Sequence, residues 1–309
     1  MDKRTLFQSS LAVLVLGVAT LYLKSAYLSN LVMWIAIAVL TAASMRFVLL
    51  IGELNFATAA FVGLGAYSAG VAATILNWPF LAALLLAGVV SSGIGFLFGF
   101  VTLKTKGPFF LLIGFAFTEV VRLVYTKVQW LGGNSGMVGI FPPRYLEAHY
   151  STFVVMVVGV MLIVLVAFER SHLGKTFVAI RDNDQVVLSV GLNVHMLKVA
   201  CLCIGAFAAG LAGALSAFVN NVISPNDFGF LLSTFALAYL KVGGEDSPLG
   251  PVAGATLLVL LSSVALSMGA GEHVFYGLAI VFSVLLMPKG LMGLLPALRR
   301  LRSARRRSA

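Results

Sequence analysis

Long apolar stretches alternate with short polar segments along almost the whole chain. Crossing the ~30 Å hydrocarbon core of a bilayer takes ~20 helical residues, and apolar runs of that order recur throughout. Because an unpaired backbone group in hydrocarbon is costly, helices are the expected spanning elements. We place ten spans at residues 6–23, 30–51, 56–76, 80–103, 109–126, 151–168, 198–219, 227–241, 250–268 and 272–288. The pattern predicts an all-α integral membrane protein with about ten transmembrane helices.

Composition excludes a water-soluble globule. Of the 309 residues, 60% are hydrophobic and 10% are charged, and the mean hydropathy is +1.03. Such a chain lacks the polar residues that ordinarily cover a soluble protein. We expect a single polytopic domain over residues 1–298, with a cytoplasmic loop at 169–197, followed by a basic cytoplasmic tail at 299–309.

Lysine and arginine indicate the orientation, since they concentrate on the cytoplasmic side of membrane proteins. With the N-terminus inside, all but four of the 21 Lys and Arg residues fall on the cytoplasmic side. Lys24, Lys127 and Arg144 fall outside, and Arg122 lies within a span. Both termini are therefore predicted to be cytoplasmic.

The net charge, the first apolar run, the cysteines and the histidines each suggest another function or fate for the chain, and the sequence favours none of these. The net charge of +10 comes partly from six arginines after Leu298, which favour a tail near lipid headgroups over a nucleic-acid site. The run 6–23 also resembles a signal peptide, but its length and the lack of an Ala-x-Ala site favour a retained helix. Cys201 and Cys203 point to different faces of a helix and the four His residues are scattered, so no metal site is predicted.

Two polar segments interrupt the apolar pattern on opposite sides of the membrane. Residues 127–150 are external by the charge count and contain the turn-forming sequences GGNSG and PP. Residues 169–197 are cytoplasmic and predict two short helices. The first runs from Gly174 to Arg181, and Asn183 or Asp184 caps a second one that stops at Gly191. We interpret this loop as a docking element.

Small residues crowd the spans at 56–76 and 198–219, and we favour tight helix packing over direct solute contact as their role. The span at 227–241 is short and follows Pro225, which predicts a helix that is tilted, broken or extended by its flanks. Broken helices often line transport pathways.

Glu119 and Arg122 are the exceptional ionisable residues, because they lie inside the span 109–126. At positions i and i+3 they share a helix face and are able to pair. Two hypotheses stand equally: a polar lining of a translocation path, or a salt bridge that fixes one helix against its neighbours. The sequence GKT at 174–176 resembles the end of a phosphate-binding loop, but Glu169 stands where that loop needs glycine. We therefore expect no ATP site in this chain.

Several segments resemble one family in the order in which they occur. They are GLGAY at 63–67, GGNSG at 132–136, SHLGKTFVAIRDND at 171–184, GLNV at 191–194, GAFAAGLAGAL at 205–215, ISP at 223–225, GG at 243–244, GPVAG at 250–254 and PKGL at 288–291. Together they resemble the LivM-type permease subunits of branched-chain amino-acid ABC importers. The resemblance covers residues 30–296, and the order of many motifs, rather than any single one, makes it specific.

The resemblance implies a type II ABC importer-like permease bundle in the inner membrane, which is a transport subunit and not an enzyme. It also implies a homologous LivH-like second permease subunit, two ABC ATPase subunits that bind ATP and Mg²⁺, and a periplasmic solute-binding protein. The chain itself is expected to hold no cofactor and to bind no nucleic acid. The resemblance further implies that the cytoplasmic loop holds the coupling helix, for which we expect Arg181, Asp182, Asn183, Asp184, Gln185, Val187 and Leu188. The hypothesis of a polar path names Glu119, Arg122, Thr118, Tyr67 and Ser68.

The chain also departs from its relatives. Many carry Gln, Gly and His where this chain has Glu53, Ala57 and Thr58, which predicts differences in the solute path or its gating. Glu245 and Asp246 replace a usual Leu-Gly pair in a cytoplasmic loop. Alternatives to branched-chain amino acids are urea, short amides and aromatic acids. A stand-alone ion-coupled carrier and a membrane anchor for a cytoplasmic complex remain as other functions.

Overall fold

The computed structural model describes residues 25–105, 107–147, 149–267, 277 and 290–292. The predicted span 6–23 and the basic tail at 299–309 lie outside these residues, and so does the predicted span 272–288 apart from residue 277. Among the described residues, five helices are long and apolar enough to cross a membrane: α2 (Ala26–Leu49), α4 (Phe80–Thr102), α5 (Pro108–Lys127), α7 (Tyr150–Arg170) and α10 (Val194–Asn220). Three shorter apolar helices are α3 (Thr58–Thr74), α11 (Phe230–Gly243) and α12 (Gly250–Ser267).

The eight predicted spans that overlap the described residues therefore coincide with helices. We expected each of these eight spans to cross the membrane, but five of the eight helices are long and apolar enough to do so, and three are shorter. The predicted spans at 56–76 and 227–241 gave shorter helices because non-helical backbone precedes both α3 and α11.

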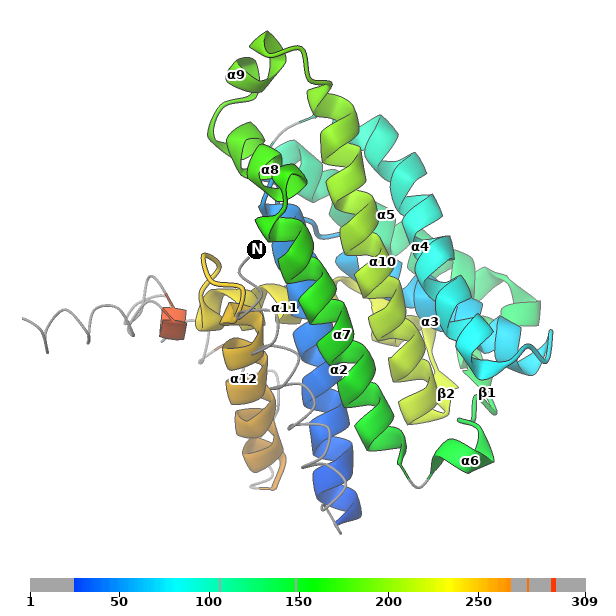
Figure 1. The fold of residues 1–309 in the computed structure, drawn as a ribbon. Helices are drawn as coiled ribbons and strands as arrows, with labels where there is room; N and C mark the ends of the chain where they lie inside the picture. The colour runs from blue at the N-terminus through cyan, green and yellow to red at the C-terminus, as the bar shows by residue number, and fades with distance from the viewer. Residues whose placement is uncertain (1–24, 106, 148, 268–276, 278–289, 293–309) are drawn as a thin grey trace, which may run out of the picture.

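Short elements gather at the two ends of the bundle (Figure 1). At one end lie α8 (His172–Asp182) and α9 (Asp184–Ser189), as the sequence predicted for the cytoplasmic loop. At the other end lie α6 (Arg144–Glu147) and a two-stranded antiparallel sheet that pairs Met137 with Ile223. Its strands are β1 (Met137–Val138) and β2 (Val222–Ile223), and the 3₁₀ helices are η1 (Gln129–Leu131), η2 (Gly133–Ser135) and η3 (Pro225–Phe228). Segments that the charge count assigns to opposite sides thus lie at opposite ends.

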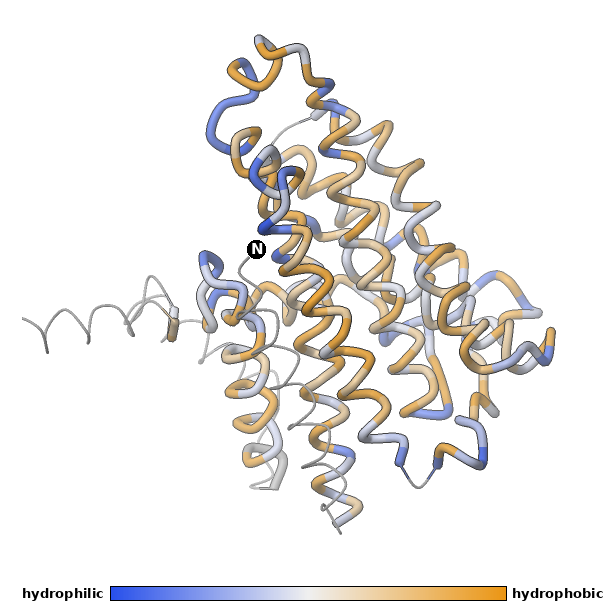
Figure 2. The backbone as a smooth tube through the Cα atoms, viewed as in Figure 1, coloured by the Kyte–Doolittle hydropathy of each residue, from blue (hydrophilic) through white to orange (hydrophobic). Residues whose placement is uncertain are grey.

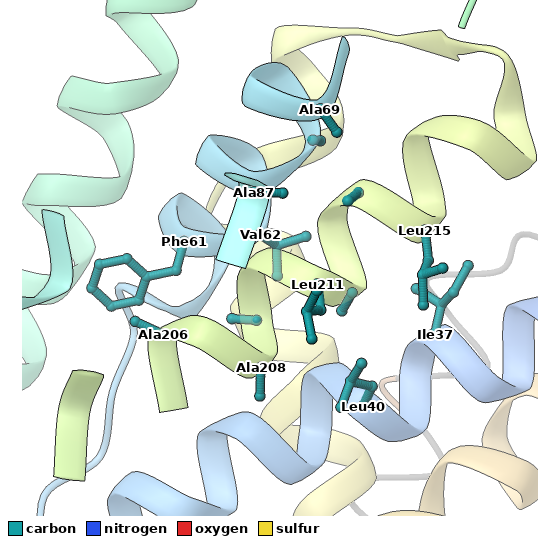
Figure 3. Packing of buried hydrophobic residues seen from close by; sticks show 14 of the residues in the cluster. Ile37, Leu40, Phe61, Val62, Ala69, Ala87, Ala206, Ala208, Leu211 and Leu215 are labelled. Carbon is teal, nitrogen blue, oxygen red and sulfur yellow. The ribbon is translucent and has the colours of Figure 1, made fainter. Parts of the chain in front are cut away.

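Helices α2 and α10 form the centre, and α10 packs against α2, α3 and α4. Val62 of α3, Leu211 of α10 and Leu40 of α2 belong to the same buried cluster (Figure 3). Close approach depends on glycine: a Cβ added to Gly213 would lie 1.8 Å from the carbonyl oxygen of Val62. The small residues of α3 and α10 therefore serve packing, as we favoured, because no side chain fits between these backbones.

Apolar side chains also cover the outside of the bundle. Hydrophobic residues run along the middle of the long helices, whereas hydrophilic ones concentrate toward the ends (Figure 2). Leu85 of α4, Leu112 of α5 and Val160 of α7 are all exposed. Such a surface suits hydrocarbon rather than water as the surrounding medium.

A partly buried ion pair ties three elements together at the α8–α9 end. The Arg46 guanidinium of α2 contacts both carboxylate oxygens of Glu169 on α7, at 2.8 and 2.9 Å. Arg46 Nε also donates to the carbonyl oxygen of Glu245, in the loop before α12, at 3.0 Å. Two parallel charge-assisted hydrogen bonds fix the guanidinium, so the ends of α2 and α7 are held in one arrangement.

Gly213→Ala should destabilise the protein by about 1–3 kcal/mol, because the new methyl group overlaps the backbone of α3. The measurement is the midpoint of thermal unfolding of the purified protein in detergent. Gly93→Ala is the matched control, since a Cβ at this α4 position meets nothing within 4 Å. Equal midpoints for the two variants would contradict the role of Gly213 in packing.

Candidate functional site

The first break in the helices lies at residues 50–57, the linker between α2 and α3. Within this 50–57 linker, Gly52 has a φ of +80°, and the Asn55 side-chain oxygen accepts a hydrogen bond from the Ala57 N–H at 3.0 Å. The carbonyl oxygen of Phe56 accepts hydrogen bonds from the hydroxyls of Thr118 at 3.0 Å and Ser233 at 2.8 Å. Side chains from α5 and α11 therefore supply hydrogen bonds to a backbone carbonyl group that has no helical partner where the helix is interrupted.

The second break precedes α11. Ser224 caps η3 in a capping box: its hydroxyl accepts from the Asn226 N–H, and its own N–H donates to the Asp227 carboxylate at 2.9 Å. The chain then turns at Gly229, and α11 begins at Phe230. Of the alternatives left open for the short span at 227–241, the structure shows a break, because η3 and α11 are two separate helices.

Glu119 and Arg122 join α5 to this second break. Arg122 Nε lies 2.7 Å from Glu119 Oε2, and an Arg122 guanidinium nitrogen donates to Asn226 Oδ1 at 3.3 Å. Glu119 Oε1 accepts from the N–H of Phe230, the first residue of α11, at 3.4 Å. A carboxylate at a helix N-terminus interacts favourably with the helix dipole. The pair thus has a structural role, and its side chains, 26% and 28% exposed, still reach the surface.

We define the α3–α5–α11 junction by six residues: Phe56, Thr118, Glu119, Arg122, Asn226 and Ser233. Three of the five residues predicted for a polar path, Thr118, Glu119 and Arg122, come together here. Thr118 is fully buried, whereas Glu119, Arg122 and the exposed Asn226 offer polar side chains to a solute or partner.

The other two predicted path residues take part in packing on α3. The Tyr67 ring is buried and stacks on Tyr125 of α5, with 4.0 Å between ring centroids, and meets Phe228 edge to face at 6.0 Å. The Ser68 hydroxyl donates to the carbonyl oxygen of Leu64 within its own helix at 2.6 Å. This aromatic cluster holds η3 against α3 and α5.

Sequence reasoning did not single out Phe56, Asn226 or Ser233. Phe56 acts through its backbone, and Ser233 is a small polar residue in an apolar run, so neither carries a signal in one sequence. The capping box Ser224-Pro225-Asn226-Asp227 was a readable signal for the second break.

The loop at 169–197 is a folded unit with a buried base. The Ser171 side chain caps α8, and the Asn183 side chain caps α9 by accepting from the Gln185 N–H at 2.9 Å. Ile180 of α8, Val187 of α9 and Val194 of α10 form a buried cluster. These contacts hold the two short helices against the end of α10.

The seven residues predicted for coupling divide into two sets. Val187 is buried in the cluster just described, and Asp184 faces Lys198 of α10 at 3.4 Å. The other five are exposed: Arg181, Asp182, Asn183, Gln185 and Leu188. Leu188 is flanked by further exposed apolar side chains, Val186, Val190 and Leu192. Exposed apolar side chains beside a rigid base are typical of a protein-binding surface.

This combination defines a class of protein. Membrane-spanning helices are interrupted twice where a polar cluster lies within the bundle, and a folded loop projects from one end. Helices broken in this way are characteristic of membrane transport proteins, in which irregular backbone lies beside the transport path. The structure is therefore that of a multi-pass transport permease.

The chain belongs to the family described as branched-chain amino acid transport system / permease component, whose family model matches residues 27–287. This is a family of transport subunits and not of enzymes, and the resemblance inferred from the motifs is confirmed. Two similar proteins are the LivM high-affinity branched-chain amino acid transport system permease proteins of Salmonella typhimurium, 28% identical over 262 residues, and Escherichia coli K12, 27% identical over 262 residues.

Each of these two alignments covers 75% of this chain, which spans 62% of the length of the relative. The autoinducer 2 import system permease protein LsrC of Salmonella paratyphi B is 27% identical over 151 residues, which are 47% of this chain and 43% of that protein. No solved structure gave a significant match.

Arg122→Met should lower the thermal midpoint more than the double replacement Arg122→Met with Glu119→Gln. The single change leaves a carboxylate in the membrane without its guanidinium, whereas the double change removes both charges. We expect a coupling free energy of about 1 kcal/mol, near the upper end for partly exposed pairs. Lys241→Met is the control, because the Lys241–Glu245 pair is 45% and 40% exposed. Strictly additive effects at Glu119 and Arg122 would contradict this assignment.

Proposed function

We propose that this chain is the membrane-spanning permease subunit of an ATP-binding-cassette importer, which moves branched-chain amino acids or related small amino acids into the bacterial cytoplasm. Its membership in the branched-chain amino acid permease family carries the proposal. The LivM relatives, whose names describe high-affinity branched-chain amino acid transport, support this solute class. We place the chain in the inner membrane with both termini in the cytoplasm.

The proposed complex contains a homologous second permease, two ATPase subunits and a periplasmic solute-binding protein. ATP and Mg²⁺ bind to the ATPase subunits, and this chain supplies the docking loop and part of the path. The exposed side chains around Leu188 support a contact between α9 and an ATPase subunit, since they stand on a base that α8 and α10 hold in place.

In the proposed cycle, ATP binding closes the ATPase subunits and displaces α8 and α9. The bundle then rocks between two arrangements and alternately exposes the α3–α5–α11 junction to each side of the membrane. Glu119 and Arg122 present opposite charges 2.7 Å apart, which suits transient contact with the ammonium and carboxylate groups of an amino acid. Tyr67 and Ser68, which are engaged in packing, support the path wall rather than line it.

A second solute class has one specific observation in its favour. The relative from Salmonella paratyphi B belongs to an autoinducer 2 import system, so proteins similar to half of this chain serve different solutes. The same machinery would then carry another small molecule, for example urea, a short amide or an aromatic acid.

Reconstitution of the complete complex in proteoliposomes tests the function. With binding protein outside and ATP inside, radiolabelled leucine should accumulate, and unlabelled isoleucine and valine should compete. If urea, amides or aromatic acids compete and the branched-chain amino acids do not, the importer assignment stands and the proposed solute is replaced by that competitor. Uptake driven by an ion gradient without ATP would overturn the importer and favour an ion-coupled carrier.

Two neighbouring substitutions separate docking from folding in α9. Leu188→Asp places a charge on the exposed surface and should abolish ATPase capture and ATP-driven uptake without lowering the thermal midpoint. Val187→Asp buries an unpaired charge and should lower the midpoint as well. Copurification of the ATPase subunits and thermal unfolding provide the two measurements. Normal ATPase capture by Leu188→Asp would show that α9 does not dock in this way.

A further inference from the structure

Lys198 of α10 is a buried cation that two other segments contact. Its side chain is 5% exposed, and its ammonium nitrogen lies 3.4 Å from Asp184 Oδ2 of α9 and 3.8 Å from Glu53 Oε1 of the 50–57 linker. The Glu53 side chain is likewise 5% exposed. One ammonium group therefore bridges the docking loop and the linker that begins the first helix break.

Glu53 extends the connection to α5. Its second carboxylate oxygen, Oε2, accepts a hydrogen bond from the N–H of Gly107, immediately before α5, at 3.0 Å. Helix α5 carries Thr118, Glu119 and Arg122 farther along. A carboxylate at a helix start binds unpaired N–H groups and interacts favourably with the helix dipole. Glu53 thus contacts both Lys198 and the start of the helix that supplies half of the α3–α5–α11 junction.

A second contact reinforces the same connection. A Cβ added to Gly52 would lie 3.0 Å from the side-chain Cγ of Arg181, so α8 packs directly against the linker. Gly52 has a φ of +80°, a conformation that favours glycine. Four residues farther along, the Phe56 carbonyl receives the hydroxyls of Thr118 and Ser233. The 50–57 linker therefore touches the docking loop at one end and the junction at the other.

Stability alone does not account for this arrangement. Removing ammonium and carboxylate groups from water is costly, and replacing a buried ion pair with neutral side chains of similar volume is often neutral or stabilising. Such groups are best explained where they specify one arrangement of the elements that carry them. Here the elements are the loop proposed to contact an ATPase and the backbone beside the proposed path.

We propose that Lys198 is a positioning residue that transmits displacement of α8 and α9 to the 50–57 linker and to the start of α5. Displacement of α9 moves Asp184 relative to Lys198, and the ammonium group carries Glu53 with it. The hydrogen bond from Gly107 and the contacts of Phe56 then pass the shift to α5 and α11. This inference rests on the proposed importer function and identifies how its two sites communicate.

The test replaces the three charged residues together, as Glu53→Gln, Asp184→Asn and Lys198→Met. This neutral triple variant keeps side-chain volume, removes the three charges of the cluster together and leaves the exposed side chains around Leu188 unchanged, so it should fold and assemble with its ATPase subunits. In proteoliposomes with leucine as the solute, ATP hydrolysis should continue while leucine taken up per ATP falls about tenfold, a typical coupling between two sites. A merely structural ion pair predicts wild-type uptake per ATP.

A matched control removes another buried pair at the same end of the bundle. Arg46→Met with Glu169→Gln neutralises the pair between α2 and α7, whose partners lie outside the 50–57 linker. Uptake per ATP should stay at the wild-type value in this variant. Wild-type coupling in the neutral triple variant, or an equal loss in the control, would overturn the proposal.

Hydrogen exchange on the purified full chain gives a readout that does not depend on transport. In the neutral triple variant, amides of residues 52–57 should exchange about tenfold faster than in wild type, while amides in the middle of α3 should not change. Unchanged exchange at 52–57 would overturn the role of Lys198 even if the complex transports no leucine. If hydrogen exchange changes as expected but the wild-type complex shows no ATP-driven uptake, the importer function is overturned instead.

Discussion

A backbone carbonyl or amide that leaves a helix inside a membrane must find another partner, because the surrounding hydrocarbon offers none. At both helix breaks in this protein, side chains provide the partners that the hydrocarbon does not. At the first, the carbonyl of Phe56 accepts the hydroxyls of Thr118 and Ser233; at the second, the carboxylate of Glu119 accepts the N–H that begins α11. Helix α5 supplies a side chain to each break, and α11, which follows the second break, also supplies Ser233 to the first, so the two interruptions depend on the same pair of helices.

Close packing between α3 and α10 supplies the rigid part against which these breaks are held. Backbone contacts such as those of Gly213 with Val62 leave no room for a shift of one helix along the other. Beside the aromatic contacts of Tyr67, the elements near the breaks also meet through single hydrogen bonds and ion pairs, whose partners are able to separate without opening a cavity. Motion within the bundle is therefore expected along α5, α11 and the 50–57 linker rather than between α3 and α10.

The length of the apolar runs was enough to predict the positions of the eight spans that the structure describes, because lipid demands long apolar helices. The same reasoning anticipated a short helix after Pro225 but missed the shortness of α3, because the residues at 50–57 that precede it are mostly apolar. It located the pair Glu119 and Arg122, whose charge is unusual within a span. It did not locate Phe56, which contributes a carbonyl oxygen common to every residue, nor the inward turn of Val187, which depends on contacts with Ile180 and Val194.

The charged groups at the α8–α9 end illustrate two different uses of a buried ion pair. Arg46 and Glu169 make parallel hydrogen bonds between adjacent helix ends, a geometry that resists displacement. Lys198 instead holds two carboxylates at 3.4 and 3.8 Å, without such a fixed fork, and each belongs to a non-helical or short segment. An ammonium group is a compact charge with rotatable donors, so it tolerates movement of its partners while keeping them together. The contrast in geometry favours Arg46 as a static clamp and Lys198 as the joint between moving parts.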